Sequence, residues 1–305
     1  ELARDNVDVC WTVATNPVAG MPDAGHVERA LDDAFLIAQD AFRSDTVELA
    51  DVVLPAATWG ESEGTTTNME RRVSRVTAAT DPPPAVRRDI DVIAAIGNRI
   101  HPGLFDDPPL DPAAVFDEIR DLTAGTTADL SGISYERLAS ELAVRWPAPT
   151  ADAQGGYRYR DGDGWSFDTA SGRARFSTVA HSEVPEPVDG EYPLTLTTGR
   201  ADGVYNTGVR TGDGDGDGRP TARVHPETIA RHLAAFDRGE TVISSRRSDV
   251  RVAVSPNDDV PTGMVWLPIH YGAINELTLS AVDPDSAEPN FKQCAARLVA
   301  AEAEL

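Results

Sequence analysis

The sequence is poor in lysine, cysteine and aromatic residues, and it has no long apolar run. Lys292 is the only lysine among 305 residues, and arginine supplies the rest of the strongly basic side chains. Such a lysine is either a chance surface cation or a residue with a specific role. No segment reaches the roughly 18 apolar residues that a membrane-spanning helix needs, and no signal peptide opens the sequence. We therefore expect no membrane insertion.

The two cysteines, Cys10 and Cys294, are too few for a disulfide framework and too far apart for a CxxC metal site. Cys10 lies in the run Val7–Val13, which alternates like a buried strand, so a core thiol is the favoured interpretation. We expect Cys294 to be structural as well. Thiols without disulfide partners indicate a cytoplasmic, reducing compartment.

Acidic residues strongly outnumber basic ones. Fifty Asp and Glu against 27 Lys and Arg give a formal charge of -23, spread along the whole sequence. This distribution argues against nucleic acid or an anionic membrane as a partner, because phosphate binding requires a basic patch. Together with the scarcity of lysine and aromatics, it is typical of proteins from salt-loving organisms. In molar salt the Debye length falls to about 3 Å, so this charge would not repel a small anionic substrate at long range.

The first hundred residues alternate strand and helix patterns, which predicts a parallel sheet of the α/β class with ligands at the carboxyl ends of its strands. The predicted strands are Val7–Val13, Phe35–Gln39 and Ala50–Leu54, and the predicted helices are His26–Leu31 and Asp89–Ile100.

Two more helices are predicted at Pro112–Leu122 and Tyr135–Ala143. From Trp165 the texture changes to short strands with Gly and Pro turns, which suggests a compact barrel. The predicted strands are Gly172–Phe176, Tyr192–Thr198, Glu240–Ser244, Val250–Val254 and Gly263–Leu267. We place a domain boundary between residues 150 and 190, giving an α/β domain at 1–155 and a mainly β domain at 156–305.

Six motifs, in one order, resemble prokaryotic molybdopterin oxidoreductases. A single short motif such as Thr-Gly-Arg occurs often by chance, whereas six in family order form a strong signal. They cover nearly the whole chain: Thr15-Asn16-Pro17 with Ala50-Asp51-Val-Val-Leu-Pro55, Trp59-Gly-Glu-Ser-Glu-Gly64 through Asn68-Met-Glu70-Arg71-Arg72, Ser171-Gly-Arg-Ala-Arg-Phe176, Thr198-Gly199-Arg200 with Tyr205-Asn206-Thr207, His225-Pro226-Glu227, and Asn275-Glu-Leu-Thr through Asp283-Pro284 to Phe291-Lys292-Gln-Cys294.

The resemblance implies a cofactor, bis-molybdopterin guanine dinucleotide with molybdenum or tungsten. It also implies a Rossmann-like sheet domain followed by a double-psi-type β-barrel that binds the dinucleotide. The sequence opens on Glu1 without an initiator methionine, so we expect a C-terminal half. The family's N-terminal half normally carries the iron-sulfur cluster, expected here as 4Fe-4S, and the side chain that binds the metal. Neither cysteine matches those positions, so no metal ligand and no catalytic residue is assigned.

The resemblance places cofactor contacts at strand ends and in barrel loops, where carboxylates and amides suit the rings and sugars, and backbone amides suit the phosphates. Glycine in such a loop allows close backbone approach. The candidate cofactor-binding residues are Asn16, Gln39, Asp40, Asp89, Thr198, Gly199, Arg200, Tyr205, Asn206, Thr207, His270, Asn275 and Lys292.

Some of these positions depart from the family pattern or have a structural alternative. Ser62 stands where relatives usually have lysine, and Tyr205-Asn206 replaces an aromatic-histidine pair. Asn16 before Pro17 could instead fix a turn. In the same way Asp51 could cap a turn and Glu70 could pair with Arg71.

Two further motifs suggest metal or base chemistry but have simpler interpretations. Asp213-Gly-Asp215-Gly-Asp217-Gly218 resembles the start of a calcium loop, but the position of the closing glutamate is Val224. A flexible acidic hairpin tip is favoured. His225 before Pro226 is interpreted as a turn residue, whereas His270 keeps both a structural and a pterin-facing interpretation.

The shared signature at Glu63–Arg72 occurs in assimilatory nitrate reductases and in formate dehydrogenases. The tail Asp283–Lys292 is slightly closer to the nitrate reductases, so the resemblance favours reduction of nitrate to nitrite by oxygen-atom transfer. Formate oxidation and a catalytically inert cofactor-binding fragment are the alternatives. The expected partners are the missing N-terminal half and an electron donor such as ferredoxin.

Overall fold

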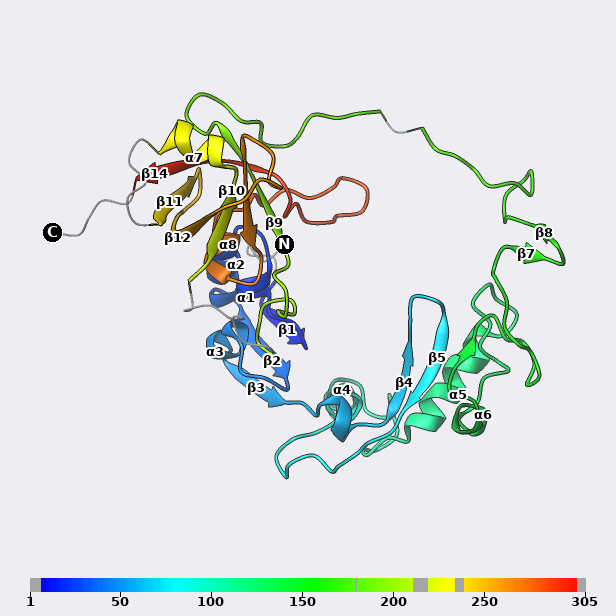
Figure 1. Cartoon of the computed structure of the whole chain (residues 1–305). Helices are drawn as coiled ribbons and strands as arrows, with labels where there is room; N and C mark the ends of the chain where they lie inside the picture. The colour runs from blue at the N-terminus through cyan, green and yellow to red at the C-terminus, as the bar shows by residue number, and fades with distance from the viewer. Residues whose placement is uncertain (1–6, 179, 211–218, 234–238, 301–305) are drawn as a thin grey trace. The chain divides into compact units, whose positions relative to one another are not determined.

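The computed structural model describes residues 7–178, 180–210, 219–233 and 239–300 (Figure 1). They form two compact units, one made of residues 1–54 with 181–305 and the other of residues 55–180. Each unit is described by itself below. The domain boundary predicted at residue 155 stays a prediction, because a compact unit and a family domain need not share their limits.

The first unit begins with a three-stranded sheet in the order β1-β2-β3, formed by Val9–Val13, Phe35–Asp40 and Val52–Pro55. Strands β1 and β2 are parallel, with Val13 opposite Gln39. Parallel strands require a crossover connection, and here helices α1 (Pro17–Gly20) and α2 (Ala24–Asp32) connect β1 to β2. Helix α3 (Asp45–Leu49) connects β2 to β3. Both carboxyl ends therefore lie at one edge of the sheet.

The rest of this unit is a closed barrel, with its strands in the order β10-β12-β11-β14-β9-β13. The core consists of alternate aliphatic residues such as Leu194, Leu196 and Val252, as expected for strands with one buried face. The barrel strands are β9 (Leu194–Gly199), β10 (Thr221–Val224), β11 (Glu240–Ser245), β12 (Asp249–Pro256), β13 (Met264–Pro268) and β14 (Cys294–Ala300). Helices α7 (Pro226–His232) and α8 (Gly272–Glu276) interrupt them.

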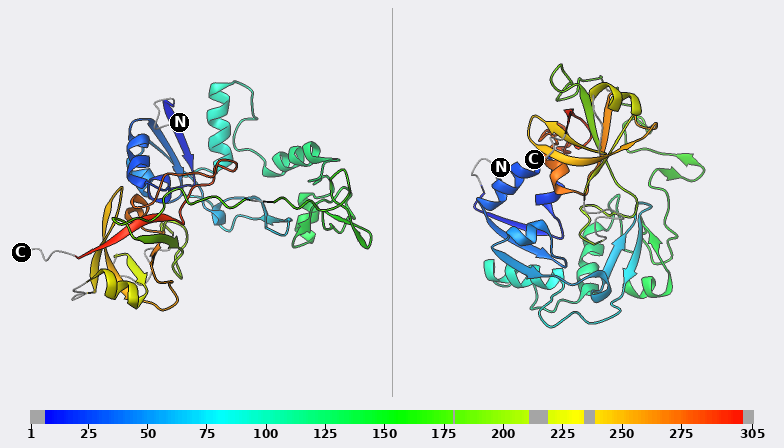
Figure 2. Two further views of the ribbon diagram at one scale, coloured as in Figure 1. Left: turned by 90° about the horizontal axis from the view of Figure 1, so that it is seen from above. Right: turned by 60° about the vertical axis from the view of Figure 1, so that its left-hand side comes forward.

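Helix α8 of the barrel lies against α1 and α2 of the sheet (Figures 1 and 2). The backbone N–H of Asp23 donates to Thr278 Oγ1 at 3.3 Å. Gly272 also packs closely, because a Cβ added there would lie 3.4 Å from the Cβ of Ala19. The sheet and the barrel thus form one packed unit, and the loops at their junction have fixed neighbours.

The second unit combines helices with a small antiparallel sheet in the order β4-β5-β6. Its core contains Val73, Phe116, Ile133, Tyr135, Leu138, Val144 and Ala148. Its elements are the 3₁₀ helix η2 (Trp59–Glu61), β4 (Gly64–Thr67), β5 (Arg72–Val76), α4 (Asp89–Ile100), α5 (Pro112–Thr123), α6 (Tyr135–Ser140), β6 (Val144–Arg145), β7 (Arg160–Asp161) and β8 (Gly164–Trp165).

The predicted fold class, a parallel α/β region followed by a barrel, is confirmed. One predicted strand is wrong, because residues Gly172–Phe176 form no strand. Gly172 has a left-handed φ of 66° and closes a turn, in which its N–H donates to Thr169 O at 2.9 Å and its carbonyl accepts from Phe167 N at 3.2 Å. The second correction is smaller, since α6 ends at Ser140 and not at Ala143.

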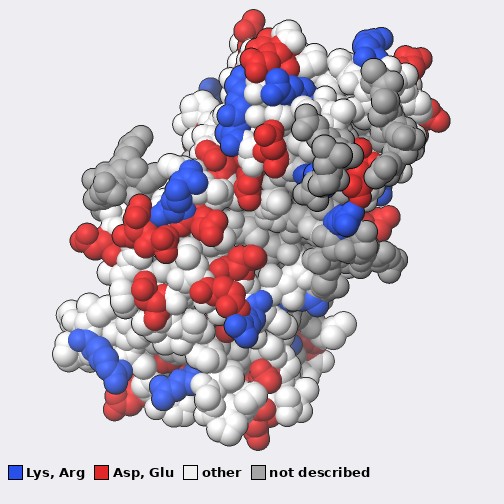
Figure 3. All heavy atoms as spheres, turned by 90° about the vertical axis from the view of Figure 1, so that its left-hand side faces the viewer, with Lys and Arg blue, Asp and Glu red and all other residues white. Residues whose placement is uncertain are grey.

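The cysteines are free thiols, and Cys294 is buried in the barrel core. Burial raises the pKa of the Cys294 thiol to about 11, which makes it a structural residue with little thiolate at neutral pH. Among the described residues, no helix is both long and apolar enough to cross a membrane. On the face that Figure 3 presents, acidic side chains occur in several separate groups with arginines interspersed.

Candidate cofactor-binding site

Three predicted residues lie at the carboxyl edge of β1 and β2. Asn16 follows β1 at the start of α1, and Gln39 and Asp40 are the last two residues of β2. Gln39 is fully buried, and its carbonyl accepts from Ala14 N at 2.8 Å. One carboxylate oxygen of Asp40 accepts from Phe42 N at 3.0 Å. The edge therefore gathers two amides and a carboxylate, with the Gln39 side chain buried beneath it.

Thr198 and Lys292 join the end of β9 to the segment that precedes β14. The hydroxyl of Thr198 donates to Phe291 O at 2.7 Å, and Nζ of Lys292 donates to Thr198 O at 2.6 Å. Each segment thus binds the backbone of the other. The single lysine is exposed, and its amine has a defined partner in a backbone carbonyl.

Gly199 ends β9 beside the indole of Trp266 on the neighbouring strand β13. A Cβ added to Gly199 would lie 2.3 Å from Nε1 of Trp266, closer than real Cβ contacts allow. The guanidinium of Arg223 lies over this indole, 4.5 Å from the ring centroid. Any larger residue at position 199 would collide with the indole, so the packing of Trp266 requires glycine here.

The residues after Gly199 form a loop that we call the β9 loop, residues 199–208. Arg200 donates through Nη2 to Asn206 Oδ1 at 3.1 Å, and its guanidinium lies 5.7 Å from the ring centroid of Tyr205. Asn206 has a left-handed φ of 50°, a conformation that asparagine tolerates better than most residues. In place of the family's aromatic-histidine pair, this chain has Tyr205 and Asn206, which both contact Arg200 and orient it.

His270 and Asn275 come from the segment between β13 and β14. His270 is buried, with its ring centroid 4.2 Å from that of Tyr271. The side chain of Asn275 is fully buried, and its Nδ2 donates to Ala19 O at 2.7 Å and to Ile269 O at 3.0 Å. Its Oδ1 has no hydrogen-bond partner among the described residues, so the amide is held firmly with one acceptor available.

Asp89 belongs to the second unit, where it is the first residue of α4. The other predicted residues all belong to the first unit. The calcium-like motif Asp213–Gly218 lies outside the described residues, and Val224, at the position of the closing glutamate, is a fully buried strand residue. Among the described residues, no group of three or more His, Cys, Asp or Glu could hold a metal ion.

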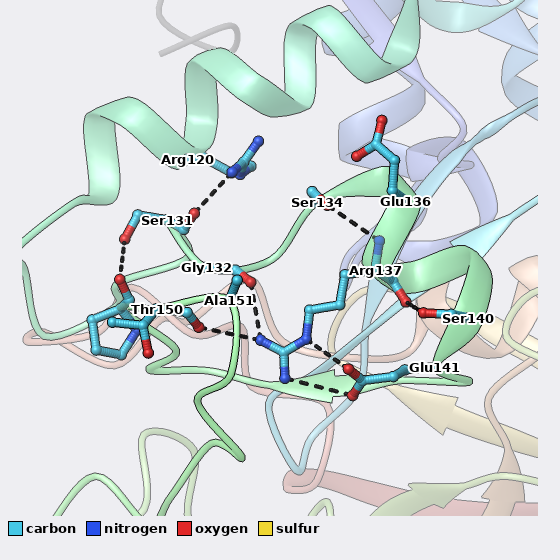
Figure 4. Close-up of a pocket in the computed structure, with 11 residues that line it drawn as sticks. Arg120, Ser131, Gly132, Ser134, Glu136, Arg137, Ser140, Glu141, Thr150 and Ala151 are labelled. Atoms are coloured by element: carbon cyan, nitrogen blue, oxygen red, sulfur yellow. Dashed lines mark hydrogen bonds and ion pairs between the residues drawn. The ribbon is translucent and has the colours of Figure 1, made fainter.

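The second unit contains a polar hollow of about 520 Å³ (Figure 4). Arg137 at its wall donates to the carboxylate of Glu141 and to the carbonyls of Gly132, Thr150 and Ala153. A guanidinium has five N–H donors, and these five bonds engage all of them. Arg137 is therefore a structural residue that ties α6 to the loops before and after it, and we assign no ligand to this hollow.

Two family models match the chain. Residues 1–99 match the molybdopterin oxidoreductase model, and residues 194–295 match the molydopterin dinucleotide binding domain. The chain is 59% identical over 297 residues to an assimilatory nitrate reductase of the halophile Haloferax mediterranei. It belongs to the molybdopterin oxidoreductase family. The predicted family and the predicted cofactor class, a molybdopterin dinucleotide, are confirmed.

Other members of the family are more distant. A nitrate reductase of Synechocystis is 35% identical, and the alpha subunit of an F420-dependent formate dehydrogenase of Methanococcus maripaludis is 32% identical, each over 97% of this chain. The Haloferax match covers 95% of this chain. The chain spans between 42% and 44% of the length of these relatives.

A solved structure has the same fold. Acetylene hydratase from Pelobacter acetylenicus matches 98% of this chain and 45% of its own, with a TM-score of 0.73 and 16% identity. At this identity the likeness concerns the fold alone. It extends over both compact units of the chain.

The residues of the first unit fit a dinucleotide of this class. Asn275 presents a buried amide oxygen without a described donor, which suits an N–H of a pterin or guanine ring, because an unpaired buried acceptor costs about 1–3 kcal/mol. Asp40 supplies an acceptor for a ribose hydroxyl. We propose that these residues contact the bound dinucleotide.

Several residues of this region were missed by sequence reasoning. Thr46 and Asp45 form hydrogen bonds with the side chain of Asn16, and the Trp266 ring packs against Gly199. Glu186 is buried against Arg247. These residues lie in α3, in β13 and in the loop before β9. Contacts between separate elements leave no periodicity in the sequence, so a pattern alone could not have singled them out.

Two structural alternatives proposed from the sequence need correction. Asp51 does not cap a local turn, because its Oδ2 accepts from Leu36 N at the start of β2, at 2.7 Å. Glu70 pairs with Arg72 at 3.1 Å, whereas Arg71 donates to Gly156 O at 2.9 Å. His225, predicted as a turn residue, caps α7 through its Nδ1, which accepts from Glu227 N.

Replacing Lys292 with methionine is expected to loosen the segment before β14. Methionine keeps the apolar stem but removes the donor to Thr198 O, a loss of about 1 kcal/mol for one hydrogen bond. Hydrogen exchange of residues 281–293 in the full-length protein should rise, and the amount of bound cofactor should fall. Arginine at this position, which keeps a cationic donor, is the control. Unchanged exchange and cofactor content in the methionine variant would contradict a role for the amine.

Proposed function

We propose that this chain is the C-terminal part of a nitrate reductase that uses bis-molybdopterin guanine dinucleotide with molybdenum. The observation that carries the proposal is the 59% identity to the Haloferax assimilatory nitrate reductase over nearly the whole chain. The formate dehydrogenase of Methanococcus maripaludis is only 32% identical over a similar span. The chain covers less than half of either relative, so the activity proposed is that of the whole protein.

The bound cofactor would supply two-electron oxygen-atom transfer, in which nitrate, two electrons and two protons give nitrite and water. The residues of this chain would bind and orient the dinucleotide. Asn275 would accept a hydrogen bond from a ring N–H through its buried Oδ1. Lys292 and Thr198 would hold the segment before β14 against β9.

Formate oxidation is the second candidate, because formate dehydrogenases share 32–33% identity with this chain over most of its length. Tungsten in place of molybdenum also stays open. The proposed partners are the rest of the protein and an electron donor such as ferredoxin. A cytoplasmic location belongs to the same proposal and is supported by the two free thiols.

The deciding experiment uses the full-length protein. Nitrite formed from nitrate with reduced viologen should exceed, by orders of magnitude, the viologen reduced by formate. Metal analysis and release of GMP by acid hydrolysis should give about one metal and two GMP per protein. Formate-dependent reduction without nitrite formation would replace the proposal with its second candidate. The isolated 305-residue chain should form no nitrite, and turnover by it would contradict its role as a partial cofactor-binding part.

A further inference from the structure

Every hydrogen-bonding group of the Asn16 side chain has a partner within the protein. Its Oδ1 accepts from Thr46 N at 3.1 Å and from Thr46 Oγ1 at 2.8 Å. Its Nδ2 donates to Asp45 Oδ2 at 3.0 Å and to Thr207 Oγ1 at 3.2 Å. A side-chain amide has two N–H donors and two acceptor lone pairs, so these four bonds engage its full capacity.

The bond to Thr207 connects distant parts of the chain. Thr207 lies in the β9 loop, 191 residues after Asn16. Its methyl group also packs on the sheet side, because a Cβ added to Gly20 would lie 3.2 Å from Thr207 Cγ2. The β9 loop is therefore held to the carboxyl edge of β1 by one hydrogen bond and one close methyl contact.

The Thr207 hydroxyl keeps a group for a ligand. Its oxygen accepts from Asn16, which occupies one of two lone pairs, and the hydroxyl hydrogen is a separate donor. No acceptor for that hydrogen occurs among the hydrogen bonds of the described residues. The amide of Asn16 therefore limits the directions in which the Thr207 O–H can donate, and the loop backbone is fixed at the same point.

We propose that Asn16 is a positioning residue that acts through Thr207 and does not itself touch the dinucleotide. Thr207 donates to an oxygen of the ligand, and Asn16 holds Thr207 and the β9 loop at the carboxyl edge of the sheet. This inference rests on the proposed cofactor-binding function. Contact between Asn16 and the ligand would require one of the four internal bonds to break, whereas Thr207 needs no such exchange.

A double-mutant cycle in the full-length protein tests the inference. The variants are Asn16→Ala, Thr207→Val and the two combined, with Thr207→Ser, which keeps the hydroxyl, as the conservative control. Asn16→Ala is expected to raise hydrogen exchange in the β9 loop and to lower bound GMP per protein, each by about two- to tenfold for one lost hydrogen bond. In the Thr207→Val background the same change should lower bound GMP no further, because groups that act as one unit are non-additive.

The opposite results would overturn the proposal. If Asn16→Ala lowers bound GMP as much in the Thr207→Val background as in the wild type, Asn16 contacts the ligand directly. If exchange in the β9 loop is unchanged by Asn16→Ala, the positioning link is absent. Bound GMP equally low in Thr207→Ser and Thr207→Val would remove the hydroxyl from the ligand contact.

Two measurements keep the test decisive. Exchange in the cofactor-free protein reports on the link even if wild-type protein proves to hold no dinucleotide, a result that would reject the proposed function alone. Gly20→Ala disturbs the same loop from its methyl side, and Gly20 has no left-handed φ that alanine would strain. It should raise exchange in the β9 loop, and Thr207→Ser should suppress that rise by removing the methyl group. Failure of both effects would contradict the proposed packing.

Discussion

Replacing Glu186 with alanine is expected to lower the free energy of unfolding by about 3–5 kcal/mol, the usual range when one partner of a buried ion pair is removed. Glu186 is 9% exposed. Its two carboxylate oxygens accept from Nη1 and Nη2 of Arg247 at 2.8 and 2.9 Å, and from Ala295 N at 2.9 Å. Arg246 lies 3.1 Å away. Alanine would leave two guanidinium groups and a strand N–H without this acceptor.

The loss should extend to the cofactor site, because Arg247 also donates through Nε to Leu277 O at 3.1 Å. Leu277 follows helix α8, which carries Asn275. Denaturant unfolding of Glu186→Ala and of Glu186→Gln separates the effects, since glutamine keeps the volume and one acceptor but not the charge. Glutamine should therefore be destabilising to a smaller extent. Equal stability of wild type and alanine variant would show that the pair contributes nothing.

The same residue predicts a pH dependence. Burial opposes ionisation of Glu186, but the hydrogen bonds from Arg247 and Ala295 outweigh it, and the net result is a pKa lowered from its ordinary value of 4.5. A carboxyl with a lowered folded pKa stabilises the protein above its unfolded pKa and loses that contribution as pH falls through the folded pKa. Wild-type stability should fall as the pH drops below about 4.5, and Glu186→Gln should remove part of that fall. Parallel curves for both proteins would contradict the assignment.

Replacing Gly199 with alanine is expected to lower stability by about 1–3 kcal/mol, as overpacking generally does, and to reduce bound cofactor. The added Cβ would lie 2.3, 2.9 and 3.1 Å from three atoms of the Trp266 ring. To relieve the contact, the ring would have to give up its stacking with Arg223, because the backbone of Trp266 is paired with Thr197 on the neighbouring strand. Thermal unfolding and GMP content of the full-length protein are the two measurements.

Two variants show whether the Gly199 effect is steric. Gly190→Ala is the matched control, because a Cβ at Gly190 meets nothing within 4 Å and the backbone there is not left-handed. It should change neither quantity. Trp266→Phe shortens the ring and should restore part of the stability of Gly199→Ala. If the Trp266→Phe substitution gives no such recovery, the clash with the indole is not the cause.

The elements with a strong local pattern could be predicted from the sequence. Helix α4 was predicted at Asp89–Ile100 and has those bounds, because its apolar spacing is a property of one segment. Strand β2 and the barrel strands β11 to β13 were predicted in the same way from local alternation. Strands β10 and β14 were not predicted, since their pairing with distant strands decides them.

The candidate site was predicted as a set of residues but not as a set of contacts. The motifs place Asn16 and Thr207 in one family site, yet only the structure shows that they bind each other across 191 residues. Lys292 was singled out by composition, and its partner, the carbonyl of Thr198, is 94 residues away. Backbone carbonyls are identical along a sequence, so a sequence pattern cannot select one as a partner.

The sequence by itself therefore determined the family, the order of sheet and barrel, and the residue types offered to the dinucleotide. Each depends on local spacing or on motifs that are read in order. Only the tertiary structure decided that Glu186 is a buried ion-pair partner of Arg247, 61 residues away, and that the amide of Asn16 is fully engaged inside the protein. Closure of the barrel and its packing on the sheet bring these groups together, and hydrogen bonds form between whichever donors and acceptors that packing leaves adjacent.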